Sequence, residues 1–158
     1  MEFELTTGTF ESILDEKGRV VIPALMREYY TEKLVATQGL EDCVWIMTIP
    51  VYKRLVDSIN SLEESLTCDQ IEAFRYQHEA PARIVEIDSK TGRIPIPTAL
   101  RNYANLSKEC LVLSIDDHLE IWNEEDYIVF RNTKQKIAKK AKKIVGGKVN
   151  FFRKKEQE

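Results

Sequence analysis

Apolar and polar residues alternate near the start of the chain in the manner of a β-hairpin. Residues 9–14 alternate and end at the polar segment 15–18, in which Gly18 can adopt the positive φ that a tight connection needs. Residues 19–22 are rich in β-branched side chains, which favours a returning strand. The pattern therefore predicts two strands joined by a short turn.

A short helix and a second hairpin are predicted next. Pro23 suits the first position of a helix, where its missing N–H costs nothing, and residues 24–30 can continue that helix. Residues 34–38 and 43–48 have the composition of strands and flank the turn-forming segment 39–42. One unit of strand, turn, strand, helix and hairpin results.

The same order of elements occurs twice. Residues 13–27 (ILDEKGRVVIPALMR) resemble residues 87–101 (IDSKTGRIPIPTALR), with a constant offset from Arg19 onward. The likeness continues in the second hairpin of each copy, which ends near residue 48 and near residue 122. Because so many positions agree, we interpret the chain as a duplicated small domain and predict a mainly β, α+β fold.

The segment between the copies has helical periodicity. Residues 51–61 and 69–79 are each predicted to be helical, and Thr67 begins a Thr-x-x-Gln capping box. We therefore divide the chain into a first half at 1–62, a helical connector at 63–81, a second half at 82–130 and a C-terminal tail at 131–158.

The net charge of −3 conceals an uneven distribution. Residues 131–158 hold eleven Lys and Arg and two acids, giving +9, whereas residues 1–130 hold twelve basic and 24 acidic residues, giving −12. An acidic body argues against a broad basic groove for nucleic acid. Any contact between the body and DNA must therefore come from a few concentrated positions.

Composition also limits the chemistry. No apolar run is long enough to span a bilayer, and the acidic start 1–4 does not resemble a signal peptide. Cys43, Cys68 and Cys110 are dispersed, which favours buried thiols in a reducing compartment over disulfides or a zinc site.

Enzyme chemistry finds little support in the sequence. There is no Gly-rich phosphate loop and no Ser or Cys nucleophile beside a His. His118 follows Asp116 and Asp117, but a hairpin turn explains this group better than a metal site, because the first copy has no histidine there. We predict no catalytic residue, no metal, no cofactor and no small-molecule substrate.

Basic residues recur at equivalent places in the two copies. Six of the twelve in the body do so: Lys17, Arg19, Arg27, Lys90, Arg93 and Arg101. The planar fork of arginine suits guanine or phosphate, lysine suits phosphate, and a two-stranded ribbon is narrow enough for the major groove of DNA. Asp15 and Asp88 are expected to orient the neighbouring arginine through bidentate pairs.

A simpler explanation exists for each of these charges. Acidic and basic residues are ordinary in solvated β-turns, although a turn needs only Gly and Asp or Asn, so recurrence in two diverged copies favours a function. For Arg27 and Arg101, a salt bridge inside the barrel explains the residue at least as well as a contact with a base.

The motif itself resembles a known family. The pattern Asp-x-Lys-Gly-Arg-x-x-x-Pro-x-x-x-Arg, complete from Asp15 to Arg27, is similar to that of the MraZ family of bacterial transcriptional regulators. The second copy, ending in His118-Leu119-Glu120-Ile121-Trp122, resembles the second half of that family, so the resemblance covers residues 9–130. AbrB and SpoVT regulators and MazE-type antitoxins share only a single copy.

The resemblance carries expectations of fold, assembly and function. It implies a swapped-hairpin β-barrel of the AbrB type, formed by two halves of one chain, and a ring-shaped homo-oligomer in the cytoplasm, associated with the nucleoid. It implies sequence-specific binding to G-rich direct repeats of double-stranded DNA upstream of its own operon, the division and cell-wall gene cluster, which is usually repressed. The motif arginine that reads DNA carries over to Arg19 and to Arg93.

Two features depart from the family pattern. The second turn, 88–93, is one residue longer than the first, 15–19, which puts the equivalence of the two turns in doubt. Pro95 removes a hydrogen-bond donor from its strand and predicts an edge position or a bulge.

The lysine-rich tail is not part of the resemblance. Ile137, Ala141, Ile144 and Val145 are spaced as on one face of a helix, and lysines fill most of the rest, up to Gly146-Gly147. Non-specific contact with DNA, packing on the acidic body of a neighbour, and a solvated extension all remain open; attachment to a membrane surface is less favoured.

Alternative functions remain beside a DNA-binding regulator. An AbrB-like regulator or antitoxin would share the turn chemistry. A ring scaffold whose turns bind a protein belongs to a different class, and an enzyme is the least supported alternative.

Overall fold

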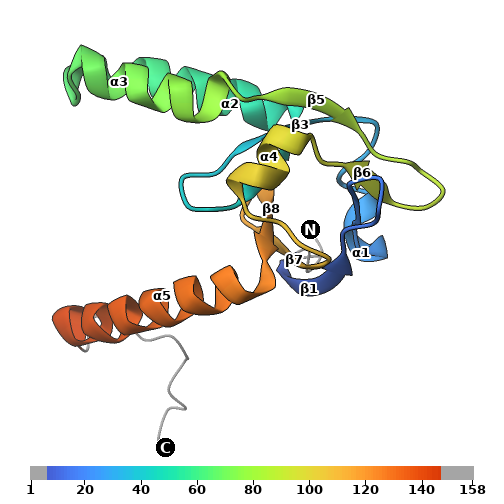
Figure 1. Ribbon diagram of the computed structural model, residues 1–158. Helices are drawn as coiled ribbons and strands as arrows, with labels where there is room; N and C mark the ends of the chain where they lie inside the picture. Colours follow the sequence, from blue (N-terminus) through green and yellow to red (C-terminus); the bar gives the residue numbers. More distant parts are fainter. Residues whose placement is uncertain (1–6, 147–158) are drawn as a thin grey trace, which may run out of the picture. The chain divides into compact units, whose positions relative to one another are not determined.

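The computed structural model describes residues 7–146 of the chain (Figure 1). These residues belong to two compact units, and the boundary between them in the sequence falls after Glu124. The first unit, called the body below, holds both copies of the repeat and the helical connector. The second unit contains nearly all of α5 (Glu124–Val145) and is described separately.

The predicted elements of the two copies are present in the expected order. The first copy contains β1 (Gly8–Ile13), β2 (Arg19–Val21), α1 (Ala24–Arg27), β3 (Lys33–Gln38) and β4 (Val44–Thr48). The second copy contains β5 (Arg83–Glu86), β6 (Arg93–Pro95), α4 (Thr98–Tyr103), β7 (Glu109–Ile115) and β8 (His118–Asn123). Strands dominate the body, which confirms the mainly β, α+β class.

Helix α1 is shorter than predicted. It ends at Arg27 instead of residue 30, and Glu28–Tyr30 form a turn. The Tyr30 side chain is 2% exposed, and its amide still donates to Met26 O at 3.0 Å. We attribute the early end to this anchoring of Tyr30 in the core, where the chain turns towards β3.

The strands of the two copies interleave. The larger sheet has six strands in the order β1-β7-β8-β4-β3-β5, all antiparallel, and the smaller sheet is the two-stranded β2–β6 ribbon. The first strand of each copy therefore pairs with a strand of the other copy: β1 pairs with β7, and β5 pairs with β3. The predicted pairing of β1 with β2 as a simple hairpin is wrong, because β1 pairs with β7 and β2 with β6, and the one bridge between the two segments is Leu14↔Val20.

This exchange gives the body an internal two-fold relation. In the ribbon Val20 lies opposite Ile94, its own equivalent, and in the large sheet Trp45 lies opposite Glu120, also its equivalent. Figure 1 shows the strands of the large sheet curving around the body, with β6 on the side away from β8. The arrangement is the swapped-hairpin barrel that the resemblance implied, made from one chain.

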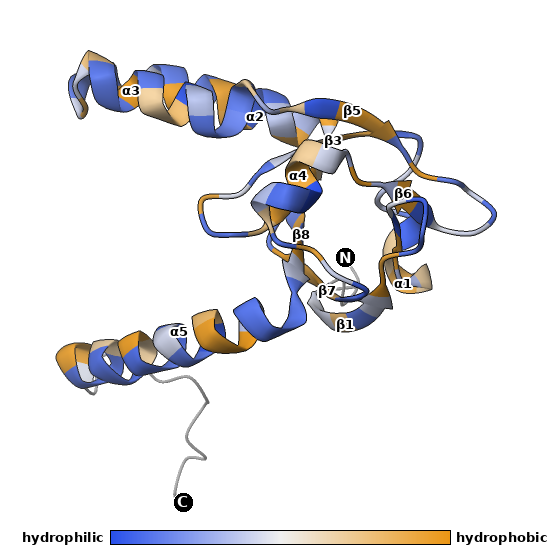
Figure 2. Cartoon of the chain, in the orientation of Figure 1, coloured by the Kyte–Doolittle hydropathy of each residue, from blue (hydrophilic) through white to orange (hydrophobic). Residues whose placement is uncertain are grey.

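One hydrophobic core joins the ribbon to the large sheet. Val20 and Ile94 of the ribbon are fully buried in the same cluster as Leu34, Ile46 and Ile121 of the large sheet. Burial of one such aliphatic side chain contributes about 1.5–3 kcal/mol. Figure 2 shows apolar and polar residues mixed along the strands, as expected where one face of a strand is buried.

The segment between β4 and β5 contains the predicted helices. They are α2 (Ile49–Asn60), the 3-10 helix η1 (Ser61–Glu64), α3 (Cys68–Phe74) and the π-helical turn η2 (Arg75–Glu79). The capping box is confirmed, because Thr67 Oγ1 accepts from Gln70 N at 3.2 Å and Gln70 Oε1 accepts from Thr67 N at 3.0 Å. Val51 of α2 packs with Val35 and Met47 of the sheet in a second, smaller apolar cluster.

Cys43 and Cys110 are buried, as predicted, but Cys68 is exposed, which contradicts the sequence interpretation. Cys68 is the first residue of α3, directly after the capping Thr67, in a connector that is mostly exposed at that point. Burial in the low-dielectric core raises the pKa of Cys110 to about 11 and keeps that thiol protonated.

Helix α5 confirms the helical part of the tail prediction. It spans 22 residues and is followed by Gly146 with a φ of 54°. Ile137 is 53% exposed and Ile144 84% exposed, and the Lys134 ammonium lies 5.3 Å from the centre of the Phe130 ring. No helix among residues 7–146 is long and apolar enough to cross a membrane. The last part of the predicted tail, 147–158, lies outside the described residues.

Candidate nucleic-acid interface

The first basic turn is built around the carboxylate of Asp15. Its Oδ1 accepts from the amides of Lys17 and Arg19, each at 2.9 Å. The main chain closes the turn at Gly18, whose amide donates to Asp15 O at 3.0 Å and whose φ is 76°. Glycine reaches this φ without steric cost, so the local sequence specifies a tight turn with Lys17 at its exposed tip.

The second turn has the same base despite its extra residue. The pair Asp88 N and Arg93 O is separated by 2.9 Å, as is the equivalent pair Asp15 N and Arg19 O of the first turn. Gly92, with a φ of 71°, donates to Asp88 O at 2.7 Å. The added residue is accommodated within the turn by Thr91, whose amide donates to Asp88 Oδ1 at 3.2 Å.

The ribbon presents both motif arginines on its outer face. Val20 and Ile94 point into the core, and side chains alternate along a strand, so Arg19 and Arg93 point outward. The two side chains are 34% and 40% exposed, respectively. Neither guanidinium is tucked into the barrel.

Pro95 occupies an edge strand, as predicted. The Ile22 amide donates to Gly92 O at 2.8 Å and the Ile96 amide to Gly18 O at 2.9 Å. Hydrogen-bonded pairs alternate along an antiparallel ladder, so the pair Arg19↔Pro95 falls at a position without hydrogen bonds. The missing N–H of Pro95 therefore costs the ribbon nothing.

One carboxylate contacts both motif arginines. Asp15 Oδ2 lies 2.9 Å from Nε of Arg19 and 3.8 Å from Nε of Arg93. The expectation that Asp88 orients Arg93 through a bidentate pair is wrong, because Asp88 instead accepts from the amides of Lys90 and Thr91. The pairing of β2 with β6 brings Arg93 of the second copy to Asp15 of the first.

Hydrogen bonds keep both turn carboxylates ionised. The backbone N–H of Arg19 holds the pKa of Asp15 below its usual value, partly opposed by desolvation and assisted by the Arg19 side chain. For Asp88 the main cause of the lowered pKa is the backbone N–H of Lys90, followed by that of Thr91. Each turn therefore carries a fixed negative charge close to its lysine and arginine.

Arg27 and Arg101 do not form the salt bridge that was one of the two sequence interpretations. Neither forms a salt bridge within residues 7–146. Arg27 lies against Gly92 and Arg101 lies against Gly18, so each packs on the turn of the opposite copy. The sequence held a signal for these contacts, since each copy repeats the same glycine and the same helical arginine.

The histidine of the second hairpin, His118, belongs to a partly buried polar cluster. His118 Nε2 and Trp122 Nε1 each lie 2.9 Å from a different oxygen of Glu120. Burial lowers the pKa of His118, but the hydrogen bond and charge of Glu120 more than offset this effect and raise it above its ordinary value. Within residues 7–146, no group of three or more His, Cys, Asp or Glu side chains could hold a metal ion.

Comparison with known proteins agrees with the duplicated motif. The chain matches the family model described as "MraZ protein, putative antitoxin-like" twice, at residues 5–72 and 80–146. The second match includes residues 131–146, which the sequence interpretation had placed outside the resemblance.

Three similar curated proteins are each named "Transcriptional regulator MraZ". One from Treponema denticola is 37% identical over 77% of this chain and 83% of its own length. Relatives from Natranaerobius thermophilus and Caldanaerobacter subterraneus subsp. tengcongensis are each 36% identical, over 76% and 75% of this chain and over 82% and 80% of their own lengths. Because the family model matches two segments that together cover most of the chain, and the relatives are 36–37% identical over most of it, the protein belongs to the MraZ family.

Proposed function

We propose that this chain is a transcriptional regulator that binds double-stranded DNA sequence-specifically through the outer face of the β2–β6 ribbon. The observation that carries the proposal is the convergence of Arg19 and Arg93 on the single carboxylate of Asp15. Two arginines from distant parts of the sequence thereby become neighbours on one exposed ribbon. The names of the relatives support the same class of function and give no reason to propose an enzyme.

The geometry of the arginine pair suits the reading of guanine. Asp15 contacts both side chains through Nε, so the terminal nitrogens of each guanidinium are left to donate to O6 and N7 of a guanine. A guanidinium held by a carboxylate also loses less conformational entropy on binding than a free side chain does. Lys17 and Lys90, exposed at the tips of the turns, are assigned to phosphates.

Affinity is proposed to come from several ribbons acting together. A single ribbon that reads a few bases and neutralises a few phosphates binds weakly, and the body around it is acidic. A ring-shaped homo-oligomer would present many ribbons, and simultaneous contact raises the effective concentration of each. Direct repeats suit such a cyclic array, so we propose G-rich direct repeats upstream of the chain's own operon, the division and cell-wall cluster, as the target, with repression as the outcome.

The test is the double variant Arg19→Ala with Arg93→Ala. Each bidentate arginine–guanine pair contributes about 1–3 kcal/mol of discrimination, so specific binding to the upstream fragment should fall by about a hundredfold or more. Assembly should be unchanged, because both side chains are on the exposed outer face. Fluorescence anisotropy with specific and scrambled DNA measures the first quantity, and mass measurement of the intact assembly measures the second.

A matched control removes two arginines from elsewhere on the body. Arg54 is 68% exposed on α2, and Arg75 begins η2, so Arg54→Ala with Arg75→Ala removes the same charge without touching the ribbon. Equal losses for both double variants would show that net charge, and not the ribbon, governs binding. If the wild-type assembly does not bind DNA but binds a protein through its turns, the result would favour the scaffold or antitoxin alternative.

A further inference from the structure

The proposed read-out leaves Arg27 and Arg101 without a role. They follow the helix-starting prolines of the two copies at the same spacing and are only partly exposed. No carboxylate forms a salt bridge with either within the described part of the chain. Each of them lies against a glycine of the other copy.

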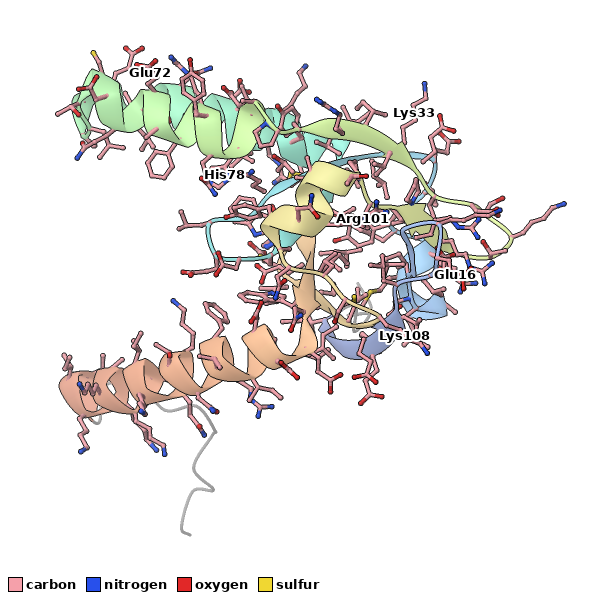
Figure 3. All side chains as sticks on the ribbon, viewed as in Figure 1. Glu16, Lys33, Glu72, His78, Arg101 and Lys108 are labelled. Carbon is pink, nitrogen blue, oxygen red and sulfur yellow. The ribbon has the colours of Figure 1, made fainter. Side chains whose placement is uncertain are left out.

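Arg101 extends from α4, where Figure 3 labels it, and lies against the first turn. A Cβ atom added to Gly18 would overlap the Arg101 guanidinium, so the two groups are in direct contact. The guanidinium is oriented by its own helix, because Nη2 donates to Thr98 Oγ1 at 2.8 Å. The Ile96 amide of the same copy donates to Gly18 O at 2.9 Å. Two groups of the second copy therefore hold the glycine of the first turn.

Arg27 makes the reciprocal contact with the second turn. A Cβ atom added to Gly92 would overlap Nε and Cζ of the Arg27 guanidinium. The same Nε donates to Ile22 O at 3.0 Å, while the Ile22 amide donates to Gly92 O at 2.8 Å. Arg27, Ile22 and Gly92 thus form one linked unit that spans both copies.

The ribbon needs such support because it is very short. It contains only three residue pairs, and an isolated two-stranded ribbon is marginal in water. Its inner side chains are held by the core, but the turns that precede β2 and β6 project beyond those pairs. Gly18 and Gly92 are nevertheless buried, each partly beneath an arginine of the opposite copy.

We propose that Arg27 and Arg101 are positioning residues, each of which holds the DNA-contacting turn of the opposite copy in place without contacting DNA. This inference rests on the proposed DNA-binding function of the turns. It makes the two copies interdependent: the first turn is complete only with α4, and the second only with α1. A single copy would therefore present an unsupported turn.

Amide hydrogen exchange tests the positioning directly and needs no DNA. Arg101→Ala should speed exchange at Lys17 and Gly18 by about tenfold while leaving Lys90 and Gly92 near wild type. Arg27→Ala should produce the reverse pattern. Arg54→Ala, which removes a more exposed arginine outside the ribbon, should change neither turn. Equal effects on both turns, or none, would overturn the proposal.

Salt dependence separates positioning from contact with phosphate. Loss of one phosphate contact lowers the slope of log K against log salt by about 0.9. Arg101→Ala should instead weaken specific binding at every salt concentration with the slope unchanged. Arg101→Lys should not rescue binding, because lysine keeps the charge but not the planar group that covers Gly18. A reduced slope, or rescue by lysine, would identify Arg101 as a DNA contact.

Double-variant cycles test which turn each arginine serves. Arg101→Ala combined with Lys17→Ala should deviate from additivity, whereas Arg101→Ala combined with Lys90→Ala should be additive. Arg27→Ala should show the opposite preference. If the wild-type assembly fails to bind its upstream DNA, the proposed function fails, but the exchange experiment still decides whether the arginines hold the turns.

Discussion

The two basic turns share a base but differ in how their acids are used. In both, the motif glycine has a positive φ and the carboxylate accepts from the amide of the lysine two residues on. Asp15 additionally contacts Arg19 and Arg93, whereas Asp88 accepts from the amide of Thr91, the extra residue of its turn. The two turns, which differ in length by one residue, therefore differ in what their carboxylates contact. Asp15 contacts two arginine side chains, and Asp88 accepts from main-chain amides of its own turn.

The difference shows that duplicated motifs can diverge in role while keeping their backbone. The main-chain hydrogen bonds depend on the ends of the turn, which the insertion leaves in place. The hydrogen-bond partners of the carboxylate lie inside the turn, where the insertion changes the chain. We therefore expect Asp15 to matter more for base recognition than Asp88, because Asp15 is the acid that contacts both arginines.

The largest effect is expected where the turns are alike. Gly18→Ala and Gly92→Ala should each impair the protein severely, since alanine at positive φ costs roughly 1–2 kcal/mol and its Cβ would overlap an arginine. Thermal unfolding should move to lower temperature, and specific DNA binding should fall at least tenfold for either variant.

Gly146→Ala provides the matched control for this prediction. Gly146 also has a positive φ, of 54°, but nothing lies within 4 Å of the position that a Cβ would take. Backbone strain without overlap should leave both the body and its DNA binding near wild type. A mild Gly92→Ala beside a severe Gly18→Ala would show that the second turn is dispensable.

The next largest effect separates the two acids. Asp15→Asn keeps an oxygen for the two backbone amides but places an amide group where the arginines meet Oδ2. The ratio of specific to non-specific affinity should fall by about tenfold, because two guanidinium groups lose their shared anchor. Competition between the upstream fragment and scrambled DNA measures this ratio.

Asp88→Asn is the matched variant in the second turn. Its remaining oxygen can still accept from Lys90 and Thr91, so the specificity ratio should stay within about threefold of wild type. Both variants remove one negative charge near DNA, so a rise in non-specific affinity is expected for each. Equal loss of specificity in the two variants would contradict the asymmetry.

A smaller effect is expected from deletion of Thr91, which makes the second turn as long as the first. The Arg93 amide, now 3.4 Å from Thr91 Oγ1, should then donate to Asp88 as the Arg19 amide donates to Asp15. We expect specific affinity to change by less than about threefold, because Arg93 keeps its contact with Asp15. A large loss would show that the longer turn has a function of its own.

The smallest effect is in acid titration. Both carboxyls should have a pKa below the ordinary value for aspartate, so the stability that they contribute is present above that ordinary value and is lost as the pH falls through their folded pKa values. Arg19→Ala should raise the pKa of Asp15 in an NMR titration. Arg93→Ala should leave the pKa of Asp88 unchanged, because hydrogen bonds from backbone amides are the main cause of the lowered pKa of Asp88.

Much of the local structure follows from the sequence. Gly18 and Gly92 specify their turns, Pro23 and Pro97 precede their short helices, and Thr67 caps α3, because each depends on residues a few positions away. The repeat also indicates which basic residues of the two copies are equivalent. The exposed Cys68 was missed because a lone cysteine in the sequence carries no signal of burial.

The tertiary structure alone decided how the halves combine. Local patterning predicts that β1 and β2 exist but does not say that they pair with β7 and β6, since strand pairing depends on contacts far apart in the chain. That exchange brings Arg93 to Asp15, Arg101 to Gly18 and Arg27 to Gly92. The sequence determined which charged groups the protein carries, and the swapped pairing determined which of them act together.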